Sequence, residues 1–173
     1  MKLIKLTLFI SFIFLSNILF AEQSAYMYIE GTSQAIIPGD VLIAGREGSF
    51  EVNEIHHLFQ KDSAGRVTLH PLIVTTRMSQ SMPLLLRAFD TSEVLEPITI
   101  RYYRQSPSSG MEENYYTIIL RGAKIEMLEP IMLDNTDPNT ASVPARFRIR
   151  FSYTAIEHQY NSCTLSQAYI LTN

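Results

Sequence analysis

Apolar and polar residues alternate with a period of two through much of the chain after residue 25. In the clearest case, segment 145–160, large apolar side chains occupy every second position from Phe147 and arginines fill the positions between them. Such alternation is typical of antiparallel strands with one face on a core and the other in water. The pattern predicts an all-β, mainly antiparallel fold of about six to eight strands, arranged as a barrel or sandwich. The other predicted strands are 26–31, 48–60, 68–78, 97–105 and 115–128.

Polar segments separate these strands. The segments 61–66, 104–114 and 133–144 are rich in Ser, Pro, Gly, Asn or Asp and show no apolar period, so they are predicted to be loops. Gly122 interrupts the long alternating segment 115–128 and predicts a bulge or bend there.

One segment has the period of a helix instead. From Met82, apolar residues recur at Leu85, Leu86 and Phe89, which is the spacing of a buried helix face. Ser81 or Met82 can cap this helix, and Pro83 suits its first turn, where a missing N–H leaves no hydrogen bond unmade. The sequence predicts one short flanking helix over about residues 83–90.

The first 21 residues differ from the rest of the chain. Fifteen of them are apolar, and Lys2 and Lys5 precede an uncharged run of 16 residues that ends at Ala21. A basic start, an apolar centre and a small residue at the end are typical of a secretory signal peptide. The run is shorter than the roughly 20 residues that cross a bilayer. We therefore expect a leader over 1–21 that is cleaved after Ala21, with an uncleaved anchor as the alternative, and a single domain over 22–173.

The charge balance narrows the class of partner. The chain has 14 Lys and Arg against 17 Asp and Glu, a net charge of −3. Without Lys2 and Lys5 the balance is 12 against 17, or −5. An acidic chain of this kind has no general attraction for nucleic acid or anionic lipid. Cys163 is the only cysteine, so an internal disulfide is excluded, and we expect it to act as a small apolar residue or to pair between chains.

The candidate chemistry is sparse. The sequence has no Gly-rich phosphate loop and no nucleophile elbow, and one cysteine cannot build a thiolate zinc site. His56 and His57 follow Glu54, but neighbours on a strand point to opposite faces and cannot share one ion. His70 and His158 are isolated and are expected near strand ends. We expect no catalytic residue, metal ligand or cofactor.

The most conspicuous polar feature is the stripe formed by Arg146, Arg148 and Arg150. Three guanidinium groups on one strand face repel one another unless acids oppose them on a neighbouring strand. Glu126 or Glu51 could supply such an acid, which would make the stripe an ordinary solvated face. The alternative is that the stripe contacts another subunit or an acidic cargo.

Beyond the leader, the chain resembles the Hcp family, the haemolysin-coregulated proteins that build the inner tube of type VI secretion systems. The resemblance covers nearly all of residues 25–161. The matching stretches are AYMYIEGTSQ (25–34), IPGDVLIAGREGSFEVNEIHH (37–57), KDSAGRVTLHPLIVTTR (61–77), SMPLLLRAFDTSEVLEPITIRYYR (81–104), SPSSGMEENYYTIILRGAKI (106–125) and SYTAIEHQYN (152–161).

This resemblance implies a β-barrel with a flanking helix that assembles into six-membered rings. The rings would stack into a hollow tube that a contractile sheath expels from the cell, with a spike protein at its tip and small effectors inside. Lys61, Asp62 and Arg66 are the candidate ring-to-ring contact. Arg87 and Asp90 are the candidate lumen or cargo face of the helix. The protein would be secreted, and neither nucleic acid nor membrane is an expected partner of the mature chain.

Three features depart from the family pattern. A leader would direct the chain to the periplasm, whereas tubes assemble in the cytoplasm. The run 65–71 is shorter than usual, and the tail 163–173 lacks an aromatic-rich ending although it is long enough for one last strand. Two alternatives therefore stay open. One is an exported relative that works as a periplasmic or extracellular binding or effector module, and the other is a small β-barrel hydrolase that uses the His and Glu residues.

Overall fold

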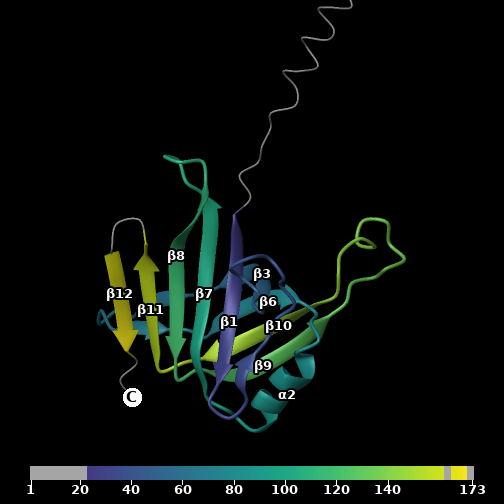
Figure 1. Ribbon diagram of the computed structural model, residues 1–173. Coiled ribbons are helices and arrows are strands. Elements are labelled where there is room, and N and C mark those ends of the chain that lie inside the picture. The colour runs from purple at the N-terminus through teal and green to yellow at the C-terminus, as the bar shows by residue number, and fades with distance from the viewer. Residues whose placement is uncertain (1–22, 162–164, 171–173) are drawn as a thin grey trace, which may run out of the picture.

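The computed structural model describes residues 23–161 and 165–170 (Figure 1). The predicted leader 1–21 and Cys163 lie outside the described residues. The elements in chain order are β1 (Ser24–Gly31), β2 (Ala35–Ile37), β3 (Phe50–His56), β4 (Phe59–Lys61), β5 (Val67–Leu69), β6 (Leu72–Arg77), α2 (Met82–Asp90), β7 (Leu95–Gln105), β8 (Glu112–Arg121), β9 (Lys124–Ile131), β10 (Arg146–Ser152), β11 (Ala155–Tyr160) and β12 (Leu165–Ile170).

Nearly all of these strands belong to one antiparallel sheet that folds over on itself. Its order is β12-β11-β8-β7-β1-β3-β6-β10-β9, with β2 also paired to β1. Figure 1 shows β12, β11, β8, β7 and β1 side by side in one layer, while β3, β6, β10 and β9 cross behind them. The predicted all-β fold with one short helix is confirmed. Among the described strands the sheet stays open, because its edge strands β12 and β9 do not pair with each other. An isolated bridge joins Leu95 of β7 to Ala123, which precedes β9.

Four of the predicted strands are each divided in two. The segment 115–128 breaks at Gly122, whose φ of +57° lies in the left-handed region. A Cβ on Gly122 would lie only 2.4 Å from Oγ1 of Thr154, so the close approach also favours glycine. At this corner the chain leaves one layer as β8 and enters the other as β9. The segment 145–160 changes layers in the same way between β10 and β11. The other two divided segments are 48–60 (β3 and β4) and 68–78 (β5 and β6).

The core fills the space between the two layers. Phe50 of β3 meets Phe147 of β10 edge to face, with ring centres 6.4 Å apart. The alternation predicted for 145–160 is confirmed in β10, where every second side chain is buried. The largest fully buried side chains are Phe50, Phe147, Phe151, Met27, Ile29, Ile37, Leu72, Leu85, Leu95, Ile98, Ile100 and Leu120.

Helix α2 packs against this core beside β9 (Figure 1). Ser81 is its N-cap residue and Pro83 lies in its first turn, as predicted. The Ser81 hydroxyl donates to the carbonyl of Pro38 instead of capping the helix. No helix in the described part of the chain is long and apolar enough to cross a membrane.

Candidate functional site

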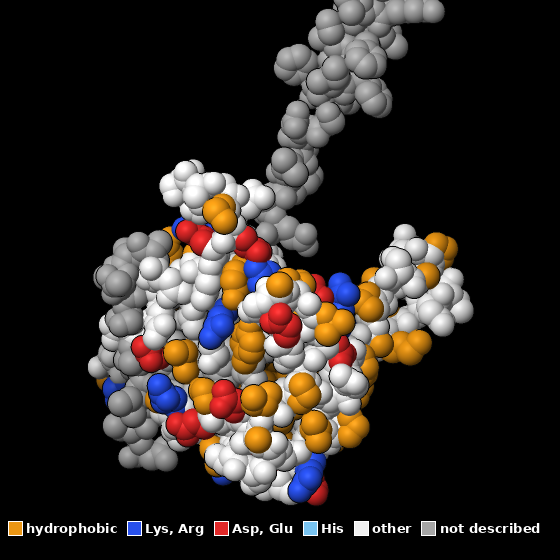
Figure 2. All heavy atoms as spheres, in the orientation of Figure 1, with side chains coloured by type: hydrophobic (Ala, Val, Ile, Leu, Met, Phe, Trp, Pro, Cys, Tyr) orange, Lys and Arg blue, Asp and Glu red, His pale blue; other side chains and the backbone are white. Residues whose placement is uncertain are grey.

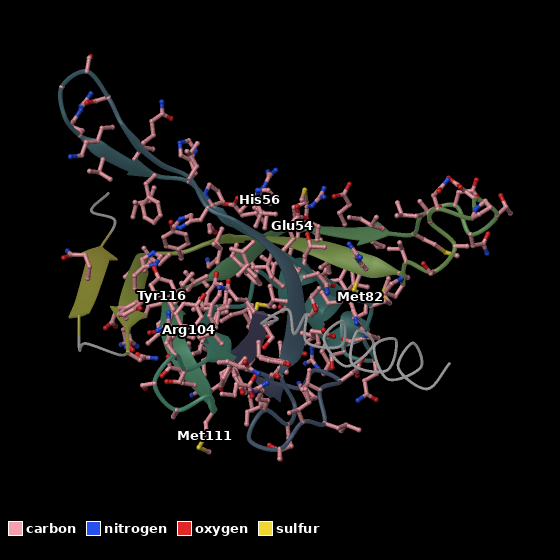
Figure 3. The ribbon with its side chains drawn as sticks, turned by 90° about the horizontal axis from the view of Figure 1, so that it is seen from above. Glu54, His56, Met82, Arg104, Met111 and Tyr116 are labelled. Atoms are coloured by element: carbon pink, nitrogen blue, oxygen red, sulfur yellow. The ribbon has the colours of Figure 1, made fainter. Side chains whose placement is uncertain are left out.

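A two-stranded arm leaves the body of the protein. It consists of β4 and β5, which pair with each other and not with the main sheet. Seen from above, the arm extends away from the body on the same side as β11 and β12 (Figure 3). The arm carries apolar side chains that are exposed to solvent: Leu58, Phe59 and Val67. An exposed apolar group of this size on a projecting hairpin is typical of a contact surface.

The tip of the arm is ordered by Asp62. One carboxylate oxygen of Asp62 accepts hydrogen bonds from the backbone N–H groups of Ala64 and Arg66, each at 2.9 Å. The other oxygen accepts from Nε of Arg66 at 2.7 Å. These hydrogen bonds, led by those from Arg66, lower the pKa of Asp62. Of the three predicted tip residues, the structure thus joins Asp62 and Arg66 and leaves Lys61 exposed at the end of β4.

The root of the arm holds a cluster of imidazole and phenol rings. Nε2 of His57 lies 2.6 Å from the hydroxyl of Tyr153 and 3.1 Å from the carbonyl of His70. The His57 ring also stacks on the ring of His158, with centres 6.1 Å apart and an angle of 14° between planes. Beside this cluster is a hollow of about 530 Å³ lined by His56, His57, Leu58, His70, Pro71, Ile73 and Arg150.

In the described residues, His56 and His57 do not converge on one point as two ligands of a metal ion would. His56 is exposed and bonds Glu54 at 2.8 Å, whereas His57 is turned into the cluster, so the two do not converge. Within residues 23–161 and 165–170, no group of three or more His, Cys, Asp or Glu residues is placed to hold a metal ion. His158 lies in β11, two residues before the strand ends at Tyr160. The expectation that it is isolated is wrong, because it contacts the hydroxyl of Tyr116 at 2.6 Å and stacks on His57.

Helix α2 presents both charge and apolar surface to solvent. Arg87 and Asp90 are exposed, so both candidate residues are accessible. The predicted buried face is only partly right. Leu85 is buried, but Leu86 and Phe89 are 47% and 42% exposed. The helix is short and buries only two residues against the body, Leu85 and Ala88.

The arginine stripe lies on the outer face of β10, where it is partly balanced by acids. Arg148 pairs with Glu129 of β9 at 3.1 Å. The opposing acid is therefore neither Glu126 nor Glu51, since Glu51 pairs with Arg77 of β6. A register shift opposite Arg150 leaves Glu126 without a cross-strand partner in β10.

Sequence reasoning missed a buried arginine in the loop before β3. Arg46 is 8% exposed and its guanidinium lies over the rings of Tyr26 and Tyr103 and also pairs with Glu112. These residues are far apart in the chain and meet only because β1 and β7 are neighbours in the sheet. No local pattern could have indicated the cluster.

The described surface thus defines a class of protein: a small folded-over β-sheet with an arm and projecting loops that suit contact with other protein chains. The family model described as "Type VI secretion system effector, Hcp" matches residues 26–160. The chain belongs to the Hcp family, and it is a structural component of a type VI secretion system.

Solved structures agree on the fold. A crystal structure of an Hcp protein has a TM-score of 0.78 at 20% identity, covering 88% of this chain and 99% of that one. The secreted protein Hcp3 from Pseudomonas aeruginosa has a TM-score of 0.73 at 24% identity, covering 88% and 100%. The Hcp1 protein from E. coli EAEC 042 has a TM-score of 0.73 at 21% identity, covering 87% and 98%. No curated protein sequence matches the chain.

Proposed function

We propose that this protein assembles into six-membered rings that stack as the inner tube of a type VI secretion system. The observation that carries the proposal is the projecting arm. Hydrogen bonds order its tip already in the single chain, and its apolar side chains are exposed. A surface ordered before contact loses little conformational entropy when it binds. In this proposal the tube bears a spike protein at its tip, is driven by a contractile sheath and carries small effectors.

The distribution of exposed apolar groups supports more than one kind of contact. Leu42, Met111 and Met132 are 89%, 73% and 74% exposed, and they lie on three separate segments. Figure 2 shows hydrophobic side chains on both projecting loops, the β7–β8 hairpin and the segment 132–145. A closed ring needs two different complementary surfaces on each subunit, and stacking needs a further pair. Several separate contact segments meet that requirement better than one patch would.

Specific residues can be assigned to these contacts. We assign ring stacking to the arm tip, with Lys61, Asp62 and Arg66 as its charged groups. We assign the lumen to α2, whose exposed Arg87 and Asp90 would meet effector proteins. A face that carries one cation and one anion beside exposed Leu86 can contact varied cargo without selecting strongly for charge.

Electron microscopy combined with light scattering tests the assembly directly. We expect particles of six subunits with a central hole, and stacks of them at higher protein concentration. A monomer at every concentration, with the native circular dichroism spectrum, would contradict the proposal.

A second function is favoured by the predicted leader over 1–21. Its basic start and apolar centre support export to the periplasm, where the protein would act as a binding or effector module without building a tube. Cell fractionation with N-terminal sequencing separates the two functions. A chain that begins at residue 22 and is found in the periplasm favours the module, whereas an intact N-terminus in the cytoplasm favours tube assembly.

A further inference from the structure

We propose that His57 and His158 form an acid-sensitive latch that holds the root of the arm against the body. His57 follows β3 where the chain enters the arm, and His158 lies in β11 of the opposite layer. Their stacked rings therefore join the two parts directly. Phe59, the first residue of β4, packs against both rings, with centres 4.3 Å from His57 and 5.5 Å from His158.

The hydrogen bonds favour one position for the proton of neutral His57. The carbonyl of His70 can only accept, and it lies within hydrogen-bond distance of both Nε2 of His57 and the hydroxyl of Tyr153. Both groups are satisfied if Nε2 carries the hydrogen and the Tyr153 hydroxyl donates to the carbonyl. Nδ1 of His57 is then a bare, basic nitrogen. It is buried, and no described group bonds to it.

His158 also has one ring nitrogen without a hydrogen-bond partner among the described residues. Its Nδ1 contacts the hydroxyl of Tyr116, while its Nε2 is buried without a hydrogen-bond partner among the described residues. In its doubly protonated form, each imidazole carries an N–H on a buried nitrogen that has no acceptor among the described residues. Protonating both would also set two positive rings 6.1 Å apart.

The surrounding groups offer little compensation for that charge. Arg150 lines the hollow beside His57 and is itself positive, and His70 lies on the same wall. The Glu54 carboxylate is engaged with exposed His56. Glu157 precedes His158 on β11, so its side chain points to the other face of the sheet, where it accepts from Gln159 at 2.8 Å.

The phenols around the stack stay neutral in the acidic range. Burial raises the pKa of Tyr153 to about 12. Burial, followed by the effect of Tyr115, raises the pKa of Tyr116. Both hydroxyls therefore keep their hydrogens, and neither supplies a negative charge to the imidazoles.

The direction of the pH effect follows from this arrangement. Burial lowers the pKa of His158, and burial followed by the charge of His158 lowers that of His57. When the arm root opens, water reaches both rings and their pKa values rise toward the ordinary 6.5 or so. The opened form thus binds more protons. Opening becomes easier as pH falls below about 6.5, by up to about tenfold per pH unit for each ring.

The arm can respond because, apart from the ring contacts and the hydrogen bond from the Tyr153 hydroxyl to the His70 carbonyl, its strands do not pair with the body. Its strands pair only with each other, and the hydrogen bond from His70 N to Leu58 O at 3.1 Å closes its base. Loss of the ring stack would loosen the arm as a unit and leave the main sheet intact. If the arm is the stacking contact, acid would also weaken stacking. That consequence rests on the proposed function, whereas the latch itself does not.

Hydrogen exchange measured by mass spectrometry tests the latch on the purified protein. Rates are taken between pH 7.5 and 5.0 and corrected for intrinsic exchange. In segment 58–70 we expect protection to fall by up to about tenfold per pH unit per histidine below pH 6.5, while β10 keeps its protection. Protection of the arm that does not change with pH would overturn the proposal.

Matched variants separate the latch from general acid sensitivity. His158→Phe keeps an aromatic ring but cannot be protonated, so the pH dependence should be roughly halved on a logarithmic scale. The double variant His57→Phe with His158→Phe should show none. His56→Phe is the control, because His56 is exposed outside the stack, and it should match the wild type.

A His158→Phe variant with the full pH dependence would also overturn the proposal. Ring formation is scored by microscopy on the same samples, so failure to assemble is distinguishable from failure of the latch.

Discussion

The guanidinium carbon of Arg46 lies 3.8 Å from the centre of the Tyr103 ring, with the ring of Tyr26 4.7 Å away on another side. This contact joins the loop before β3 to strands β1 and β7. The guanidinium also pairs with Glu112 at the start of β8. The hydrogen bond to Glu112 raises the pKa of Arg46 despite the opposing effect of burial, which is the largest single influence. One buried cation therefore ties a loop to three strands.

Replacing this cation should destabilise the protein. Arg46→Ala removes a desolvated cation–π contact and an ion pair, and we expect the free energy of unfolding to fall by about 2 kcal/mol. Urea unfolding followed by circular dichroism measures the change. Arg46→Lys keeps the charge but loses the flat stacking surface, so it should recover less than half of the loss.

Arg66→Ala is the control for that experiment. Arg66 lies at the arm tip with its side chain 83% exposed, and its removal should leave the unfolding midpoint unchanged. Equal effects of the Arg46 and Arg66 variants on unfolding would show that the contact with Tyr103 adds no more stability than an exposed side chain does.

A buried carboxylate organises the turn between β1 and β2. Glu93 is 7% exposed and accepts hydrogen bonds from the backbone N–H groups of Ser33 and Gln34 and from Nε2 of Gln34. Glu93→Gln places an N–H₂ group where Gln34 donates, so we expect a loss of about 1–3 kcal/mol in the free energy of unfolding at pH 7. Thermal or urea unfolding checks this value, with Glu30→Gln on exposed β1 surface as the control.

The same carboxylate makes stability depend on pH. Burial disfavours the ionised form of Glu93, but the hydrogen bonds from Gln34 and Ser33 outweigh it and lower the pKa. A lowered folded pKa adds stability above the unfolded value of about 4.3, and this stability is lost as pH falls through the folded value. The difference between wild type and Glu93→Gln should therefore shrink below about pH 4. A difference that grows in acid would contradict this account.

Period-two patterning predicted the parts of the fold that local burial determines. Phe147, Ile149 and Phe151 are buried as expected, because one face of β10 lies on the core along its whole length. The helix was harder to predict. Leu86 and Phe89 have the spacing of a buried helix face but remain largely exposed. The spacing shows that one face of the helix is apolar, but it does not show whether another element covers that face.

The contacts that build the candidate surfaces depend on long-range register. Glu129, not Glu126, opposes Arg148 in the pairing of β9 with β10, and the register shift beyond Arg150 leaves Glu126 without a partner. His57 and His158 meet only when the arm turns back toward β11. Neither pairing leaves a signal in the local sequence. The family resemblance is visible in the sequence because it rests on many matching stretches that follow one another in the same order.

A close approach of two backbones makes Gly39 intolerant of a side chain. A Cβ at this position would lie 2.0 Å from the carbonyl oxygen of Ser49, and backbone atoms cannot move aside as a flexible side chain can. We expect Gly39→Ala to lower the free energy of unfolding by about 3 kcal/mol or more. Differential scanning calorimetry and the yield of soluble protein measure the effect.

Gly45→Ala provides the comparison within the same loop. Gly45 has a φ of +78° but open space around the position of a Cβ, so only the left-handed backbone conformation is disfavoured, by about 1–2 kcal/mol. Gly39→Ala should be the more damaging of the two. The reverse order would mean that the loop 38–49 adjusts to the Ser49 contact without cost.

The arm tip should affect stacking without affecting the subunit. Asp62→Ala removes the carboxylate that bonds Ala64 and Arg66, so the tip loses its ordered conformation while the body keeps its core. In the proposed six-membered ring, six arms would change together, so we expect stacked rings to decrease by about tenfold or more while single rings persist. Electron microscopy counts rings and stacks at matched protein concentration. Asp137→Ala is the control, since Asp137 makes similar local bonds to Asn139 in the other projecting loop. If both variants stack like the wild type, the ring-to-ring contact lies elsewhere than the arm tip.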